Sequence, residues 1–248
     1  MRWIKLTVAY DGTAYCGWQY QPACPSVQGA VEDALGRITG EPIRTIASGR
    51  TDAGVHALGQ VVSFSTGSRL SAEVFQRALN AELPHDVAVV AAEEAPAGFH
   101  ATHDARRKRY RYVIHDGPVR DVFRVRYAWH VYQRLDAERM DRAAKTLVGT
   151  HDFRSFETSG SPRANTVRTL FEIEVRRGRG GEGDLVVTEI EADGFLYNMA
   201  RAIVGTLVEV GRGARPEPWV AGVLAANERS AAGPTAPPQG LFLVKVEY

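Results

Sequence analysis

Cysteine is scarce in this chain of 248 residues, which contains only Cys16 and Cys24. Two cysteines exclude a fold organised by several disulfides, and their spacing alone is no zinc signature. No apolar run approaches the roughly 18 residues that cross a bilayer, so we expect no transmembrane helix. The first residues alternate like a strand and do not resemble a secretory leader. These absences predict a cytoplasmic protein.

Net charge is almost absent as well, because the 30 Lys and Arg residues are nearly balanced by 29 Asp and Glu residues. This balance, with 44% hydrophobic residues, excludes an intrinsically disordered chain. The charges are unevenly distributed, since residues 101–180 contain 18 basic and 10 acidic side chains. Arginine accounts for 26 of the 30 basic residues, and its forked guanidinium suits phosphate groups. Charge alone leaves two interpretations open, a polyanionic partner or a solvated basic surface.

Hydrophobic periodicity predicts an α+β chain in which the order β-α-β-β-α-β occurs twice. The first copy comprises a strand at 4–10, a helix between Ser26 and Gly40, strands at 43–47 and 59–64, a helix from Ser71, and a strand at 86–92. The second comprises a strand at 110–114, a helix at 136–147, a hairpin at 166–175 and 184–190, a helix at 196–210, and a strand at 240–248. Segment 118–133 has no clear pattern, and segment 229–239 is expected to be a loop.

We therefore predict two tandem split βαβ units, of the ferredoxin or RRM type, with mainly antiparallel sheets. The predicted halves are residues 1–104 and 105–248. The first half contains the most unusual segment of the chain, and the second contains the basic segment and the late helix.

That unusual segment, SGRTDAG at residues 48–54, places Arg50 and Asp52 between two glycines in a loop that connects predicted strands. Glycine allows a ligand to approach the backbone closely, and backbone N–H groups can hold a carboxylate. Taken alone, the segment equally fits a tight turn in which Asp52 caps the backbone, and such turns are more common.

Six blocks in this order resemble the tRNA pseudouridine synthase A family over nearly the whole chain. The blocks are YDGTAYCGWQ (10–19), SGRTDAGVHALGQVVSF (48–64), RRKRYRYVI (106–114), HDFRSF (151–156), TVRTL (166–170) and FLYNMARAIVGTLVEVGRG (195–213). The resemblance implies isomerisation of uridine to pseudouridine at positions 38 to 40 in the anticodon arm of tRNA. It also implies that no cofactor or metal is used, that the active-site cleft lies between the two halves, and that the enzyme is a homodimer.

The resemblance assigns the catalytic roles to three residues. Asp52 is expected to be the nucleophile, and Arg201 to pair with its carboxylate, which a water-excluding site would otherwise tend to protonate. Tyr110 is expected to stack on the target base. The residues alone leave open that Arg201 is a surface residue of an amphipathic helix. They also leave open whether Tyr110 or Tyr112 is simply a structural aromatic on one face of a strand.

Substrate binding is assigned to arginines. Arg50 is expected to hold a phosphate or to take the place of the extruded base. Arg106, Arg107 and Arg109 stand beside tyrosines, a composition that suits phosphate contacts combined with base stacking. Arg111 alternates away from the tyrosines and is expected to face solvent.

Four further residues receive other interpretations. His56 is expected to be structural, and Asp11 to form a turn near the site. Metal binding by His100 and His103 is not expected, because no partner cysteines or carboxylates accompany them.

The sequence departs from the family where Tyr20 and Thr102 stand in place of expected arginines, which leaves substrate range and affinity open. Two alternative hypotheses remain. One is a non-catalytic RNA-binding protein or chaperone on the same fold. The other is a glycosidase with two carboxylates, in which Asp11 assists Asp52.

Overall fold

The computed structural model describes residues 1–158 and 165–248, and the chain separates into two compact units. The first unit comprises Met1–Arg106 and Phe242–Tyr248, and the second comprises Arg107–Leu241. The division predicted from the sequence places the last strand in the second half, whereas here that strand belongs to the first unit. The predicted α+β class with mainly antiparallel pairing is confirmed.

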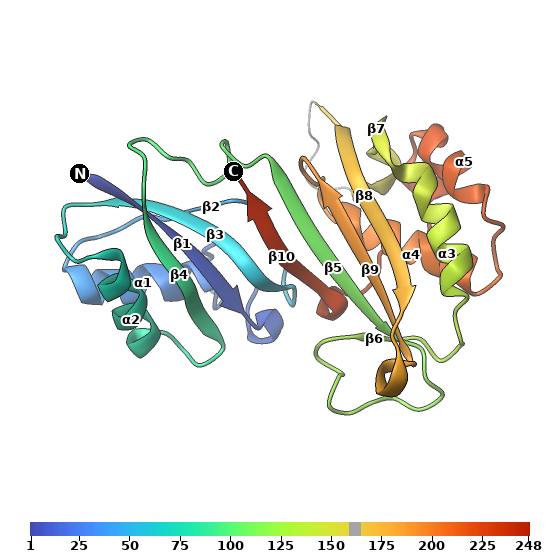
Figure 1. Cartoon of the computed structure of the whole chain (residues 1–248), viewed down its shortest axis with the longest axis horizontal. Helices are drawn as coiled ribbons and strands as arrows, with labels where there is room; N and C mark the ends of the chain where they lie inside the picture. The colour runs from blue at the N-terminus through green and yellow to red at the C-terminus, as the bar shows by residue number, and fades with distance from the viewer. Residues whose placement is uncertain (159–164) are drawn as a thin grey trace. The chain divides into compact units, whose positions relative to one another are not determined.

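The first unit is a sheet covered by two helices (Figure 1). Its strands follow the order β4-β1-β3-β10, β2 also pairs with β3, and only the β10–β3 pairing is parallel. The helices α1 and α2 contact each other, so they cover the same face of this sheet. The elements are β1 (Arg2–Tyr10), α1 (Val27–Thr39), β2 (Ile46–Ala47), β3 (His56–Thr66), α2 (Ala72–Glu82), β4 (Val87–Ala95) and β10 (Leu241–Glu247).

Local sequence signals explain these elements. Alternation along β1 buries Ile4, Leu6 and Val8 completely, as period-two patterning requires. The predicted cap of α1 is confirmed, because the Ser26 hydroxyl accepts the Gly29 amide at 3.2 Å. Such a cap satisfies one of the helix's unpaired amides and fixes where α1 begins.

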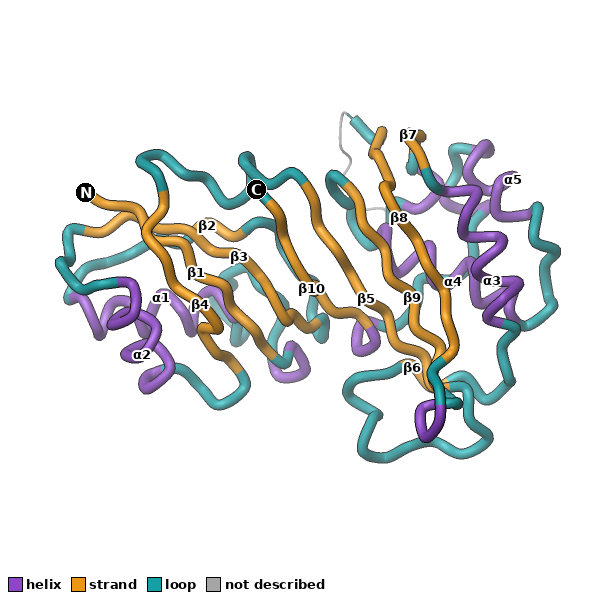
Figure 2. The backbone as a smooth tube through the Cα atoms, viewed as in Figure 1, coloured by secondary structure: helices purple, strands orange, loops and turns teal. Residues whose placement is uncertain are grey.

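The second unit contains strands in the order β5-β9-β8-β7, packed with three α-helices (Figure 2). All three pairings along this order are antiparallel, and short β6 pairs in parallel with β5. The elements are β5 (Arg107–His115), β6 (Trp129–His130), α3 (Ala137–Ala144), β7 (Gly149–Asp152), β8 (Val167–Arg177), β9 (Leu185–Ala192), α4 (Met199–Gly211) and α5 (Trp219–Ala226). The predicted hairpin across residues 177–183 is confirmed as β8 and β9.

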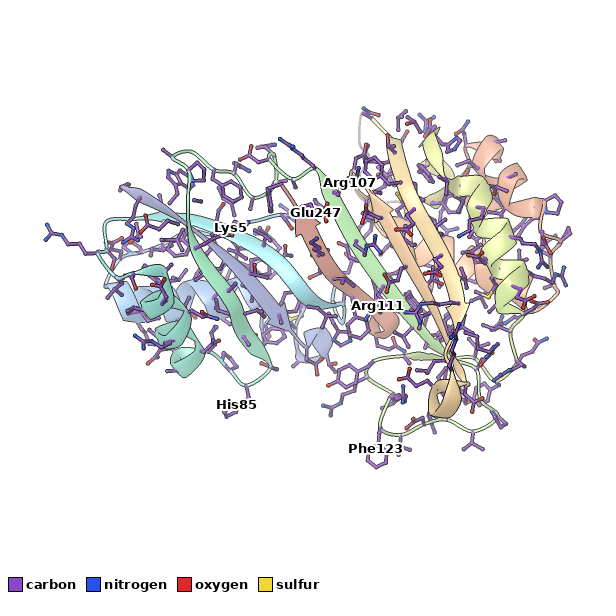
Figure 3. All side chains as sticks on the ribbon, viewed as in Figure 1. Lys5, His85, Arg107, Arg111, Phe123 and Glu247 are labelled. Atoms are coloured by element: carbon purple, nitrogen blue, oxygen red, sulfur yellow. A yellow bond between two sulfur atoms is a disulfide. The ribbon has the colours of Figure 1, made fainter. Side chains whose placement is uncertain are left out.

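The structure adds elements that the periodicity does not reveal. The helix α5 is short and apolar around its circumference, so it shows no helical stripe in the sequence. The predicted strand at 43–47 shortens to Ile46–Ala47. Segment 118–128 forms turns between β5 and β6, where Phe123 is 89% exposed (Figure 3).

Helix α4 is buried more completely than a single apolar stripe predicts. Its buried residues include Ala202, Val204 and Thr206 as well as the apolar residues Met199, Ile203, Leu207 and Val210, which follow helical spacing. The Ala/Pro-rich loop accounts for part of this burial, because the Gly233 amide donates to the Thr206 hydroxyl at 3.0 Å. A Cβ atom on Gly205 would overlap the carbonyl of Pro234, so the loop requires glycine at this position.

Two expectations drawn from absences can be compared with the structure. Among the described residues, no helix has both the length and the apolar character that crossing a membrane demands. Cys16 and Cys24, which were not expected to build a disulfide framework, form one disulfide across the turn before α1. The sequence did not predict this bridge, because the spacing of two cysteines does not determine how a loop folds back.

Candidate active site

The catalytic-loop candidate comprises residues 48–55, between β2 and β3. Ser48 and Thr51 are buried, whereas Arg50 is exposed and Asp52 is partly exposed. The chain turns after Asp52, whose carbonyl accepts the Val55 amide at 3.1 Å. Gly54 has a φ of 76°, a left-handed conformation that glycine adopts without strain. The loop therefore directs its two chemically useful side chains away from the core.

Buried polar groups hold the loop from the core side. The side-chain amide of Gln60, on β3, donates from Nε2 to the Gly49 carbonyl at 2.9 Å, and its Oε1 accepts the Ser48 hydroxyl at 2.6 Å. The Tyr10 hydroxyl and the Thr51 Oγ1 are 2.7 Å apart. Unpaired backbone groups in a core are costly, so a loop beside a strand needs such partners.

The turn after β1 also supports this loop. The Trp18 amide donates to the Thr51 carbonyl at 3.0 Å, and Gly17 approaches the same carbonyl so closely that a Cβ atom would lie 2.5 Å from its oxygen. Gly17 and Trp18, which precede α1, therefore pack on the backbone beside Asp52.

Asp11 and His56 have the positions expected of structural residues. Asp11 caps a 3-10 turn, where its Oδ1 accepts the amide and the hydroxyl of Thr13 at 2.9 and 2.6 Å. His56 is 1% exposed and stacks on Phe242 with ring centroids 4.8 Å apart. Its Nδ1 lies 3.1 Å from both the Gly12 amide and Asp11 Oδ1.

The basic strand β5 carries its arginines on one face and its tyrosines on the other. Arg109 contacts Glu172, Glu189 and Glu191, with nitrogen–oxygen distances of 2.8 to 3.2 Å. Arg107 reaches Glu191 at 3.0 Å. Arg107 and Arg111 lie along the same strand (Figure 3). We call the set Arg107, Arg109, Arg111, Glu172, Glu189 and Glu191 the Arg–Glu ladder.

The ladder follows from strand register. Arg109 stands directly opposite Glu191, and Arg111 opposite Glu189, so opposite charges face each other across the β5–β9 pairing. Burial alone would raise the pKa of Glu189, but hydrogen bonds and charge from Arg111 and Arg109 outweigh burial and lower it. Arg111, which the sequence pattern places in solvent, pairs with Glu189 at 2.8 Å instead.

Tyr110 and Tyr112 are both buried on the opposite face of β5, but their surroundings differ. Tyr112 is 1% exposed and donates its hydroxyl to the Pro237 carbonyl at 2.7 Å. Burial raises its pKa, and the nearby charge of Arg201 lowers it only in part. Tyr110 is 8% exposed, and its ring meets Phe195 edge-on with centroids 4.8 Å apart. Tyr112 therefore has a clear structural role.

Arg201 lies in the first turn of α4 and is half-buried. Its Nε donates to the Ala236 carbonyl at 2.7 Å, and its Nη1 to the side chain of Asn198 at 2.8 Å. Helix α4 is not a simple amphipathic helix with Arg201 on a solvent face, because nearly all of its residues are buried. Loop 229–239 supplies the Ala236 carbonyl, so this segment orients Arg201, a role that its composition does not reveal.

The remaining candidates contact their local surroundings. Arg106 is exposed, and its backbone amide donates to the Glu247 carbonyl at 2.8 Å. Nδ1 of His100 accepts the amides of Thr102 and His103, both at 3.2 Å, which explains the His-x2-His spacing as a turn. Tyr20 is 50% exposed. In the described ranges, no three His, Cys, Asp or Glu residues gather as a metal site.

Comparison with known proteins decides the family. The family model described as tRNA pseudouridine synthase matches residues 6–104 and 143–248. A tRNA pseudouridine synthase A from Moorella thermoacetica is 50% identical over 247 residues, which cover 99% of each chain. Another protein of that name, from a Thermoanaerobacter species, is 44% identical and covers 100% of each chain. The chain belongs to the tRNA pseudouridine synthase family.

A solved structure of a Cbf5-Nop10-Gar1 complex is also similar. The likeness covers 83% of this chain and 45% of that chain, with 15% identity and a TM-score of 0.37. The identity and the score are too low to support an argument about the site.

Within the family match, the candidate residues are not evenly covered. The matched segments contain Arg50, Asp52 and Arg201, whereas Tyr110 lies in the unmatched segment 105–142. The two curated relatives cover that segment as well. Arg50, Asp52 and Arg106 belong to the first unit, and Arg107, Arg109, Tyr110 and Arg201 belong to the second.

Sequence reasoning missed the residues that hold the catalytic-loop candidate, residues 48–55, in place. Gln60 and Tyr10 both lie within the quoted blocks, yet neither has a chemical signature of its own. Gln60 could have been found, because a fully polar amide in the apolar strand segment GQVVSF is unusual. The carboxylates of the Arg–Glu ladder could have been found from the alternation Glu189-Ile190-Glu191, but not their partners.

Proposed function

We propose that this chain isomerises uridine to pseudouridine in the anticodon arm of tRNA, at positions 38 to 40, with Asp52 as the nucleophile. The observation that carries the proposal is the exposure of Asp52 on a loop held from the core, in a chain similar over its whole length to tRNA pseudouridine synthase A. No observation favours a non-catalytic RNA-binding protein.

The proposed reaction moves one bond and leaves the composition of the tRNA unchanged. The Asp52 carboxylate attacks the bound uridine, and the N-glycosidic bond breaks. The base turns and rejoins the sugar through C5, and the bond to Asp52 breaks again, so the carboxylate is regenerated. The proton on C5 is lost while one is gained at N1. Since no atoms are exchanged overall, the reaction needs no cofactor.

We propose that Arg201 and Tyr110 act on the same uridine as Asp52. A guanidinium beside a carboxylate favours its ionised form, and a buried phenol ring offers a flat surface to an unstacked base. The hydrogen bonds of Arg201 to Ala236 and Asn198 support this role, because they fix the direction of the guanidinium.

Phosphate contacts are proposed for Arg50, Arg106, Arg107 and Arg109. Arg50 supports the proposal best, since it is exposed and makes no side-chain hydrogen bond or ion pair within the described part of the chain. Arg107 and Arg109 already pair with glutamates, so they could bind phosphate only in exchange for those partners. We also propose a homodimer in the cytoplasm, and sedimentation at several concentrations tests the oligomeric state.

The deciding experiment maps pseudouridine in an unmodified tRNA transcript after incubation with the protein. After carbodiimide labelling, primer extension should show reverse-transcriptase stops that report pseudouridine at positions 38 to 40. Free uridine incubated in parallel should remain intact. Release of uracil from the nucleoside would favour the glycosidase hypothesis, and folded protein that modifies no anticodon-arm uridine would contradict the proposal.

A further inference from the structure

Gln60 is a fully buried amide that the proposed reaction does not use. It lies on β3 with no exposed surface, and it contacts the loop twice, at the Gly49 carbonyl (2.9 Å) and the Ser48 hydroxyl (2.6 Å). A buried polar side chain costs desolvation energy that hydrogen bonds must offset. The partners of Gln60 are the two residues just before Arg50, so its hydrogen bonds set the start of the catalytic loop.

Tyr10 makes the second buried contact with the loop. Its hydroxyl lies 2.7 Å from Thr51 Oγ1, between Arg50 and Asp52 in the sequence. Burial raises the pKa of Tyr10 to about 12, although hydrogen bonds with Thr51 and Gln60 lower it in part. The phenol therefore stays protonated at neutral pH. We call the contacts of Tyr10 with Thr51 and of Gln60 with Ser48 and Gly49 the network under the loop.

These contacts hold the buried residues of the loop. Ser48 and Thr51 are 0% and 6% exposed, whereas Arg50 is exposed and Asp52 partly exposed. Thr51 lies between Arg50 and Asp52 in the sequence, so its inward hydrogen bond fixes the backbone from which both side chains extend. The direction of the Asp52 carboxylate is thus set through its neighbours.

We propose that Gln60 and Tyr10 are positioning residues that fix the catalytic loop in the orientation in which Asp52 attacks uridine. The proposal rests on the role of Asp52 in the proposed function. A nucleophile displaced by about 1 Å can lose roughly 100-fold in rate, even when the displaced residue still binds substrate. Functional side chains are commonly held in place by such supporting hydrogen bonds.

Two substitutions remove the network with little change in volume. Tyr10→Phe deletes one hydroxyl, and Gln60→Met keeps the length of the side chain without its hydrogen bonds. We expect each to lower the single-turnover rate on an unmodified tRNA transcript by about 10- to 100-fold. The dissociation constant for tRNA, measured separately by filter binding, should change less than about 2-fold, because the phosphate-binding arginines are unaffected.

The hydroxyl of Thr51 gives a rescue test. Thr51→Val should reduce the rate to the same extent as Tyr10→Phe, whereas Thr51→Ser keeps the hydroxyl and should restore it. Thr66→Val is the matched control, because Thr66 lies on β3, as Gln60 does. Thr66 is 1% exposed, and its hydroxyl donates to the Glu41 carboxylate at 2.9 Å. This control should lower the melting temperature and leave the rate unchanged.

The outcomes separate the two proposals. If the wild-type protein makes no pseudouridine, or Asp52→Asn keeps full activity, the proposed function fails. If the wild type is active and Asp52→Asn is inactive, but Tyr10→Phe and folded Gln60→Met retain the wild-type rate, only the positioning role is overturned. Equal losses of rate in Thr66→Val and Tyr10→Phe would also overturn it, since a general loss of stability would then explain both. Should Gln60→Met not fold, Tyr10→Phe and the Thr51 pair decide.

Discussion

The loop at residues 48–55 in the first unit and the Arg–Glu ladder in the second both contain arginine. They differ in whether carboxylates balance the charge of that arginine. In the loop, the backbone is held by uncharged buried groups, and the Arg50 side chain is exposed. In the ladder, Arg109 is committed to three carboxylates on neighbouring strands. A cluster of basic residues is therefore a weaker indication of an anion site than one arginine whose charge no carboxylate balances.

The largest effect should come from Asp52→Asn, which keeps the size of the side chain and removes the proposed nucleophile. We expect turnover to fall by at least about 1,000-fold, while the melting temperature and the tRNA affinity stay close to those of the wild type. Quantified pseudouridine in a full-length tRNA provides the rate. Activity within 10-fold of the wild type would show that the loop's carboxylate is not the nucleophile.

The next largest effect should separate the two regions directly. We expect Arg50→Gln to weaken tRNA binding about 10-fold and to reduce the slope of log affinity against log salt by roughly 0.7 to 0.9, the loss of about one phosphate contact. Arg109→Gln should reduce that slope less than Arg50→Gln does, because a phosphate can contact Arg109 only in exchange for its glutamates. Filter binding across a salt series measures both variants. An equal change of slope in both would mean that tRNA displaces the glutamates.

The sequence predicts a region well when the residues that interact in it are close together in the sequence. The loop was found because Gly49, Arg50 and Asp52 form one continuous motif. Helix α1 was predicted because its cap, Ser26, lies next to it in the sequence. The ladder was not found, because Glu191 lies 82 residues beyond Arg109 and only the strand register brings them opposite. For the same reason, the Ala236 carbonyl that orients Arg201 could not be predicted.

A smaller effect of opposite sign should follow from removing a ladder carboxylate. Glu191 accepts hydrogen bonds from Arg107 at 3.0 Å and from Arg109 at 3.0 Å. Glu191→Gln removes the carboxylate that pairs with Arg107 and one of the three that contact Arg109, so the ladder gains one net positive charge. We therefore expect tRNA to bind about 2- to 5-fold more tightly at low salt, with a steeper salt dependence. Unchanged or weaker binding in a folded variant would indicate that tRNA does not approach the ladder.

The smallest effect should be the pH dependence of folding stability that the ladder confers. Hydrogen bonds from Arg111 and Arg109 lower the pKa of Glu189 below its ordinary 4.5, against the opposing effect of burial. A carboxyl with a lowered folded-state pKa binds more protons when unfolded, so it stabilises the fold above about pH 4.5 and loses this contribution as the pH falls. Glu189→Gln should flatten this acid-side decline in urea unfolding. Glu174→Gln is the matched control and should keep the decline. Glu174 stands opposite Glu189 on β8, and its side chain is 53% exposed. Identical pH profiles for both variants would place the acid sensitivity outside the ladder.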